Sequence, residues 1–258
     1  MPFNFTLINC LKSNLQYATL KTLSLVSISV MTPQQTVQEL FRTADCVCFD
    51  VDSTVIRDEG IDELARFCGK GDEVKRLTAE AMGGSMTFQE ALKKRLDIIR
   101  PTASQIRQFI ATFPINLTPG ITQLVKALQD RGVTVYLVSG GFRCLIDPVA
   151  EILNIPVSNV YANRLKFFFN GEYAGFDENE PTSRSGGKGL VIRRLKEQHS
   201  YQRLVMIGDG ATDAEASPPA DGFIGFGGNV IRDEVRKKAA WYVTDFQELL
   251  TSLTIQAK

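Results

Sequence analysis

The sequence is poor in the residues that bind zinc or form disulfide frameworks. It holds one histidine, His199, and five cysteines, an odd number without regular spacing. Cys46 and Cys48 are the only close pair, so the usual cysteine and histidine ligands of a zinc site are missing. Because unpaired thiols are typical of reducing compartments, we expect a cytoplasmic protein with free cysteines.

Net charge and long apolar runs are also missing. The 258 residues carry 29 basic and 29 acidic side chains, which leaves no overall field to attract nucleic acid or an anionic membrane. The apolar stretch LKTLSLVSISV, at residues 20–30, is too short and too rich in hydroxyl groups to span a bilayer. With 44% hydrophobic residues, the chain suits one sizeable domain, or one domain with an insertion.

Residues 1–30 differ in composition from the rest of the chain. They contain Lys12 and Lys21, no arginine and no acidic residue, together with many Ser, Thr and Asn residues. The missing arginine weakens the case for a transit peptide, and the weak apolar block does the same for a signal peptide. We expect a disordered leader with Met31 as an alternative start, and a transit peptide stays open as an alternative.

From residue 121 onward, strand and helix patterns alternate, and another strand pattern stands earlier, before Asp50. Buried strands are predicted at 45–51, 133–141, 203–210 and 223–228, and the helical patterns between them indicate a parallel sheet with helices on both faces. Asn170-Gly171 separates two alternating aromatic runs and predicts a β-hairpin. Residues 58–113 contain helical patterns alone. We therefore expect an α/β core (31–57 and 114–258) and a helical cap (58–113) inserted after the first strand.

Polar residues stand where strands end or helices begin, which is where ligands bind in parallel sheets. These residues are Asp50 and Asp52 (FDVDST), Ser139, Gly140 and Gly141 (LVSGG), Lys188 (SGGKG), and Asp209 and Asp213 (IGDGATD).

Carboxylates gathered at one sheet edge would raise one another's pKa unless a cation lay between them. Mg²⁺ suits such oxygen ligands, particularly beside a phosphate. Lys188 and the donors around Ser139 suit phosphate oxygens. One carboxylate could then attack phosphorus while a second acid protonates the leaving oxygen. The pattern predicts magnesium-dependent phosphoryl chemistry.

These motifs resemble the four motifs of the haloacid dehalogenase superfamily: D-x-D-x-T after a strand, a Ser strand end, a Lys, and G-D-G-x-x-D. Over nearly all of residues 31–250, stretches such as CFDVDSTVIRDEGIDELA, SGGFR, NGEYAGFDE and FIGFGGNVIR are similar to its phosphoserine phosphatases. The resemblance implies a Rossmann-like parallel-sheet core with a small helical cap. It also implies hydrolysis of O-phospho-L-serine through an aspartyl-phosphate, one Mg²⁺ per subunit, a place in serine biosynthesis, and a homodimer.

The resemblance further implies roles for individual residues. Asp50 would be the nucleophile, and Asp52 the general acid and then the general base. Mg²⁺ would be held by Asp50, Asp209 and the backbone carbonyl of Asp52, with Asp213 supporting the site from outside. The remaining matches would bind the substrate: Ser139, Gly140, Gly141 and Lys188 at the phosphoryl group, and Glu59, Arg95, Met82, Gly83 and Thr212 around the rest of it.

Recognition of phosphoserine requires one acid and one base near the phosphate. Glu59 would bind the ammonium group and Arg95 the carboxylate, which a guanidinium can hold bidentately. Met82 and Gly83 match the cap segment that closes over the substrate. Taken alone, Glu59 and Arg95 could equally be surface charges on a helical cap.

Other functions stay open at this point. The same fold could act on another small phosphometabolite or transfer the phosphoryl group to an alcohol. A receiver-like domain also carries acids at strand ends and accepts a phosphoryl group on Asp, but it lacks a cap and an acid equivalent to Asp52. SGGKG lacks the Ser or Thr of a P-loop, and GDGATD has Asp213 where a dinucleotide-binding loop needs glycine.

Overall fold

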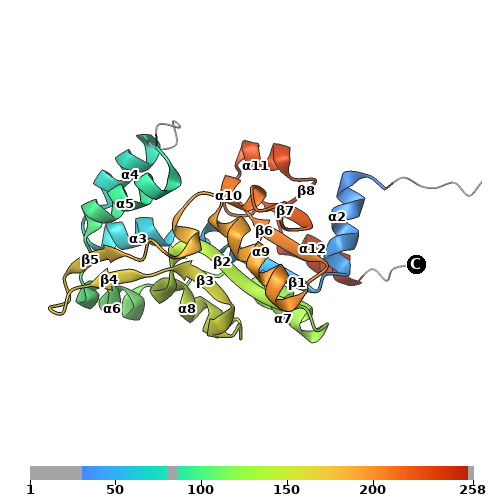
Figure 1. Cartoon of the computed structure of the whole chain (residues 1–258), viewed down its shortest axis with the longest axis horizontal. Helices are drawn as coiled ribbons and strands as arrows, with labels where there is room; N and C mark the ends of the chain where they lie inside the picture. The colour runs from blue at the N-terminus through green and yellow to red at the C-terminus, as the bar shows by residue number, and fades with distance from the viewer. Residues whose placement is uncertain (1–30, 81–85, 255–258) are drawn as a thin grey trace, which may run out of the picture. The chain divides into compact units, whose positions relative to one another are not determined.

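The computed structural model describes residues 31–80 and 86–254 of the chain. The unit that begins at Pro33 is built around a six-stranded sheet in which every neighbouring pair is parallel (Figure 1). In order across the sheet, the strands are β3 (Val160–Asn163), β2 (Thr134–Phe142), β1 (Cys46–Phe49), β6 (Leu204–Gly208), β7 (Gly222–Phe226) and β8 (Trp241–Val243). The parallel α/β core predicted from the sequence is confirmed.

Strand β1 shows why the sheet is covered on both faces. All four of its residues are buried, and because side chains alternate along a strand, they point to opposite faces. Val47 and Phe49 join one hydrophobic cluster, whereas Cys46 and Cys48 join another. The two cysteines are therefore small core side chains.

Helices from different parts of the chain cover the two faces. Those that contribute side chains to the cluster around Phe49 are α2 (Pro33–Arg42), α7 (Ile121–Asp130), α8 (Arg143–Ile152) and α12 (Phe246–Thr254). Those that pack on the cluster around Cys48 are α9 (Gly187–His199), α10 (Ala211–Ala214) and α11 (Asp233–Lys238). None of the helices within the described residues is both long and apolar enough to cross a membrane.

A third hydrophobic cluster belongs to four helices that follow β1 in the chain. They are α3 (Gly60–Phe67), α4 (Gly71–Glu80), α5 (Phe88–Ile99) and α6 (Ala103–Thr112). Thr87 begins α5 with a capping box, because its hydroxyl accepts from the amide of Glu90 at 3.2 Å and Glu90 reaches back to the amide of Thr87 at 2.9 Å. These helices fall within the range predicted as a cap, and the division into core and cap stays a prediction.

The expected hairpin is present, and it packs on the same four helices. Strands β4 (Leu165–Phe167) and β5 (Tyr173–Phe176) are antiparallel, and Gly171 takes a φ of 85° in the turn between them. Tyr173 and Phe176 are buried in the third cluster. Helices α3 to α6 therefore share their core with a hairpin from a later part of the chain (Figure 1).

Candidate active site

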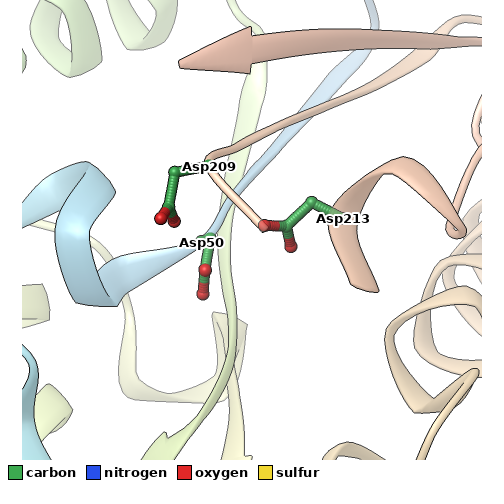
Figure 2. Close-up of side chains that lie close together, drawn as sticks. All are labelled: Asp50, Asp209 and Asp213. Carbon is green, nitrogen blue, oxygen red and sulfur yellow. The ribbon is translucent and has the colours of Figure 1, made fainter. Parts of the chain in front are cut away.

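The carboxyl ends of β1 and β6 place two acids side by side. Asp50 follows β1 and Asp209 follows β6, and these strands are neighbours in the sheet. The amide of Asp50 donates to the carbonyl of Ile207 at 2.9 Å, which extends the pairing to the site. With Asp213 of α10 they form a cluster in which one carboxylate oxygen from each residue lies within 4.8 Å of the others (Figure 2).

Lys188, in the first turn of α9, lies among these acids. Its Nζ is 2.7 Å from Asp50 Oδ1 and 2.6 Å from Asp213 Oδ1, and the lysine is buried. Although burial alone would lower the pKa of Lys188, Asp213 and Asp50 raise it above the ordinary value. Burial, followed by the charge of Asp50, raises the pKa of Asp213 to about 8 despite the attraction of Lys188. The lysine is thus a fixed cation that the carboxyl groups of Asp50 and Asp213 hold in place.

Asp52 stands in a tight turn, η1 (Val51–Val55), directly after Asp50. Its Oδ1 accepts from the amide of Gly60 at 2.8 Å, and its Oδ2 lies 3.4 Å from the hydroxyl of Ser139. Desolvation, followed by the charges of Glu59 and Asp50, raises the pKa of Asp52 to about 7. A carboxyl group with this pKa can both donate and accept a proton near neutrality.

A cavity of about 190 Å³ lies between these residues and helices α3 and α5. Its charged lining is balanced between four acids and four bases: Asp50, Asp52, Glu59, Asp209, Arg95, Arg184, Lys188 and Arg232. The rest of the lining is Ile61, Phe88, Leu92, Gly140, Gly141, Thr182, Gly210 and Thr212. A lining with equal numbers of acidic and basic side chains can bind a cation and an anion at the same time.

Glu59 lies at the start of α3 and is held from two sides. Its Oε1 accepts from the hydroxyl of Ser53 at 2.8 Å and lies 3.2 Å from Nη2 of Arg232. Arg232 also contacts Asp209, with Nε 2.9 Å from Oδ2. Burial raises the pKa of Glu59, the hydrogen bond from Ser53 lowers it, and the charge of Asp209 raises it again. The net shift is upward.

Arg95 reaches the cavity from α5. Its Nε donates to the carbonyl of Ala91 at 3.3 Å. Burial lowers the pKa of Arg95, while the nearby acids Asp62, Glu59 and Asp52 oppose the shift. The guanidinium stays charged, because even a lowered arginine pKa lies far above neutrality.

The structure brings most of the residues singled out in the sequence into one place. Nine of them line the cavity: Asp50, Asp52, Glu59, Arg95, Gly140, Gly141, Lys188, Asp209 and Thr212. Ser139 stands directly behind it and accepts from the amide of Gly141 at 2.9 Å, and Asp213 holds Lys188. Met82 and Gly83 lie outside the described residues.

The sequence analysis did not identify several residues of the lining. Thr182 and Arg184 come from the loop between β5 and α9, which includes the short turn η4 (Pro181–Ser183). Phe88 and Leu92 face the cavity from α5. Leu92 and Phe88 match the apolar stripe of any amphipathic helix, and no motif distinguishes Thr182 or Arg184, so the sequence offered no signal for them.

Comparison with known proteins defines the class to which this site belongs. Residues 44–221 match the haloacid dehalogenase-like hydrolases, and the chain belongs to this family. Within it, the chain is 59% identical over 223 residues to a phosphoserine phosphatase of Bos taurus; the match covers 86% of this chain and 99% of that one. The resemblance drawn from the sequence motifs is confirmed.

Two solved structures share the fold of this chain. A structure described as a phospho-aspartyl intermediate analogue of phosphoserine phosphatase matches with a TM-score of 0.71 and 28% identity, over 82% of this chain and 99% of that chain. The structure of DsGPDH of Dunaliella salina matches with a TM-score of 0.75 and 37% identity, over 84% of this chain. The chain spans only 37% of the length of that longer protein.

Proposed function

We propose that this chain hydrolyses O-phospho-L-serine to L-serine and inorganic phosphate, the step that releases serine in its biosynthesis. The observation that carries the proposal is the cavity in which Asp50 and Asp52 lie beside Lys188, with Glu59 and Arg95 on its other walls. Phosphoserine carries a phosphate, an ammonium group and a carboxylate, and the cavity offers a charged partner for each. The similarity to phosphoserine phosphatases over nearly their whole length supports the same substrate.

In the first half of the reaction, Asp50 is the nucleophile. Its Oδ1 accepts from the amide of Val51 at 2.8 Å and pairs with Lys188, which fixes the orientation of the carboxylate. We assign the attack on phosphorus to Oδ2. A bond forms between Oδ2 and phosphorus while the bond from phosphorus to the serine oxygen breaks. Asp52 donates its proton to that leaving oxygen, and serine departs as a neutral alcohol.

The second half reverses the role of Asp52. The carboxylate now accepts a proton from water, whose oxygen attacks phosphorus and displaces Asp50. Phosphate is released and Asp52 ends protonated, as it began. A pKa of about 7 suits both roles, since neither protonation state is rare near neutrality.

Recognition of the substrate involves both the sheet edge and the cap. Lys188, the hydroxyl of Ser139 and the amides of Gly140 and Gly141 would bind phosphoryl oxygens. Across the cavity, Glu59 would pair with the ammonium group and Arg95 with the carboxylate of the substrate. Thr212, together with Met82 and Gly83, completes the proposed contacts.

The acidic cluster fits a magnesium ion by the chemistry of its donors, which are all oxygens. We propose Asp50, Asp209 and the backbone carbonyl of Asp52 as its ligands. Asp50 and Asp209 line the cavity and Asp213 does not; Asp213 instead accepts from Lys188 at 2.6 Å and from the amide of Gly210 at 2.9 Å, which supports an outer role for this residue. When bound, the ion supplies positive charge against the phosphoryl oxygens.

Organisation, assembly and location belong to the same proposal. We propose a core of residues 31–57 and 114–258 with a cap of 58–113, because α3 to α6 supply most of a hydrophobic cluster that is separate from the two clusters on the faces of the sheet. The exposed Phe168 and Phe169 at the hairpin tip support a homodimer, which sedimentation analysis would detect.

All four cysteines of the described residues are free thiols, which supports a cytoplasmic location.

Phosphate release from O-phospho-L-serine, with and without Mg²⁺, tests the proposal. We expect turnover that requires the ion and that falls for phosphothreonine and for phosphoethanolamine, which lacks the carboxylate. An equal rate with phosphoethanolamine would contradict the role of Arg95, because that substrate lacks only the carboxylate. Product analysis in the presence of an alcohol distinguishes hydrolysis from phosphotransfer.

A further inference from the structure

Two chain segments run between the sheet and the cap helices, and they meet at one point. The amide of Thr118 donates to the carbonyl of Val55 at 2.9 Å, and the amide of Arg57 donates to the carbonyl of Asn116 at 2.9 Å. A β-bridge pairs Ile56 with Leu117 between them. The outgoing and returning segments are therefore joined by backbone hydrogen bonds at this crossing point.

A side chain from a third segment fastens the crossing point to the core. Asn229 lies in the loop after β7, and its Nδ2 is 2.7 Å from Thr118 Oγ1 and 3.0 Å from the carbonyl oxygen of Ser53. The carbonyls of Ile56 and Thr54 lie slightly further away, at 3.4 and 3.5 Å. One amide group thus contacts both the outgoing and the returning segment.

The contact with Ser53 matters because this residue has an unusual backbone. Ser53 is buried and takes a φ of 54°, in the left-handed region that residues other than glycine rarely adopt. In this conformation its hydroxyl donates to Oε1 of Glu59 at 2.8 Å. Since Asn229 holds the carbonyl of Ser53, it fixes the conformation that aims the hydroxyl at Glu59.

The same loop also reaches Glu59 by a second route. Arg232 follows Asn229 by three residues, and its Nη2 lies 3.2 Å from Oε1 of Glu59. The loop from β7 therefore controls Glu59 directly through Arg232 and indirectly through Ser53. The direct route is an ion pair between Arg232 and Glu59, whereas the indirect route begins with the neutral amide of Asn229. A change at Asn229 to another neutral side chain therefore leaves the charges of the cavity unaltered.

We propose that Asn229 is a positioning residue for Glu59, and hence for the preference of the enzyme for a substrate with an ammonium group. The inference rests on the proposed function in one respect, namely the pairing of Glu59 with that group. Without the Asn229 amide, the Ser53 turn relaxes, Glu59 loses one of its two anchors, and the site binds the ammonium group less well. Phosphoryl chemistry at Asp50 continues.

The test compares two variants with a matched control. Asn229→Ala removes the amide, and Asn229→Asp keeps its shape but replaces the donor by an acceptor. Asn116→Ala removes another asparagine of the same crossing point, whose Nδ2 donates to Asp58 Oδ2 at 2.9 Å near the surface. Each is assayed with O-phospho-L-serine and with 3-phosphooxypropanoate, the same molecule without its amino group.

We expect KM for O-phospho-L-serine to rise about tenfold in both Asn229 variants, the effect of losing one buried hydrogen bond. KM for 3-phosphooxypropanoate should change less than twofold, and kcat on either substrate should change little. Asn116→Ala should leave both substrates unaffected. Thermal unfolding of each variant verifies that it is folded under the assay conditions.

The possible failures can be told apart. Equal rises of KM for both substrates would show a merely structural role for Asn229 and overturn the inference, as would unchanged KM values. A wild-type chain that does not discriminate between the two substrates would overturn the proposed role of Glu59 itself, and the inference with it. That result is visible without any variant.

Discussion

Lys188 and Asp213 form a buried ion pair, with Nζ 2.6 Å from Oδ1 and both side chains less than one-tenth exposed. Removing the cation of such a pair leaves uncompensated carboxylates, and it also removes a donor from the phosphate site. We expect Lys188→Met to lower kcat by roughly 100-fold or more, the usual effect of losing one charge-stabilising donor. Phosphate release under saturating substrate measures it.

Lys196→Met is the matched control for this variant. Lys196 pairs with Asp221 at 2.6 Å, but both side chains are about one-quarter exposed and lie away from the cavity. Its loss should leave kcat within about twofold, since partly exposed pairs contribute little. A similar loss of activity in both variants would contradict a specific role for Lys188.

Asp50 and Asp52 should fail in different ways when each is replaced by its amide. Asp50→Asn cannot form the acyl phosphate, so no phosphoryl group should remain on the protein. Asp52→Asn keeps the nucleophile but loses the base that activates water, so a phosphorylated enzyme should accumulate. Intact-protein mass spectrometry after mixing with substrate reads both results. A phosphoryl group found on the Asp50→Asn protein would contradict the assignment of Asp50 as the nucleophile.

Arg95 should govern the affinity for substrates that carry a carboxylate. Arg95→Ala should raise KM for O-phospho-L-serine by about 10- to 100-fold, the range expected for charge-assisted hydrogen bonds. KM for phosphoethanolamine, which has no carboxylate, should stay nearly unchanged. Arg95→Lys should not restore affinity, because an ammonium group cannot form the bidentate pair. Lys93→Ala, an exposed position on the same helix, serves as the control.

The acidic cluster predicts how stability depends on pH when divalent cations are removed. Asp52 and Asp213 have pKa values of about 7 and about 8 in the folded chain, well above the ordinary 3.8. The folded state therefore binds more protons than the unfolded state between pH 4 and 8, and the free energy of unfolding falls as pH rises through this range. The unfolding temperature in EDTA should be lower at pH 8 than at pH 6.

Added Mg²⁺ should reduce this difference, because a bound cation favours the ionised carboxylates. Asp213→Asn should reduce it as well, since the variant removes one of the titrating groups. An unfolding temperature in EDTA that rises from pH 6 to pH 8 would contradict the upward shifts.

Much of the fold and part of the site could be predicted from the sequence for identifiable physical reasons. The buried run before Asp50 and the run before Asp209 are short, apolar and followed by acids, and parallel strands bring such ends to one edge. Gly141 also stands where a strand meets this edge. A side chain there would not fit, because a Cβ would lie 2.8 Å from Asp52 Oδ2. These features depend on local periodicity and on the close approach of the backbone.

The residues that could not be predicted come from loops with no repeating pattern. Thr182 and Arg184 reach the cavity because the β4–β5 hairpin returns the chain beside it, and Asn229 reaches Ser53 across 176 positions of sequence. Such contacts depend on how irregular segments are placed by the packed elements at their ends. Neither periodicity nor residue type encodes that placement.

The core that helices α3 to α6 share with the β4–β5 hairpin limits how the chain can be divided into fragments. Leu64, Leu92 and Phe109 pack with Tyr173 and Phe176, which come from a different part of the sequence. A fragment of residues 58–113 would expose the apolar surface that Tyr173 and Phe176 cover in the full chain. It should therefore aggregate or stay unfolded when expressed alone. For the same reason, exchanging caps between relatives should succeed only when the hairpin is exchanged with them.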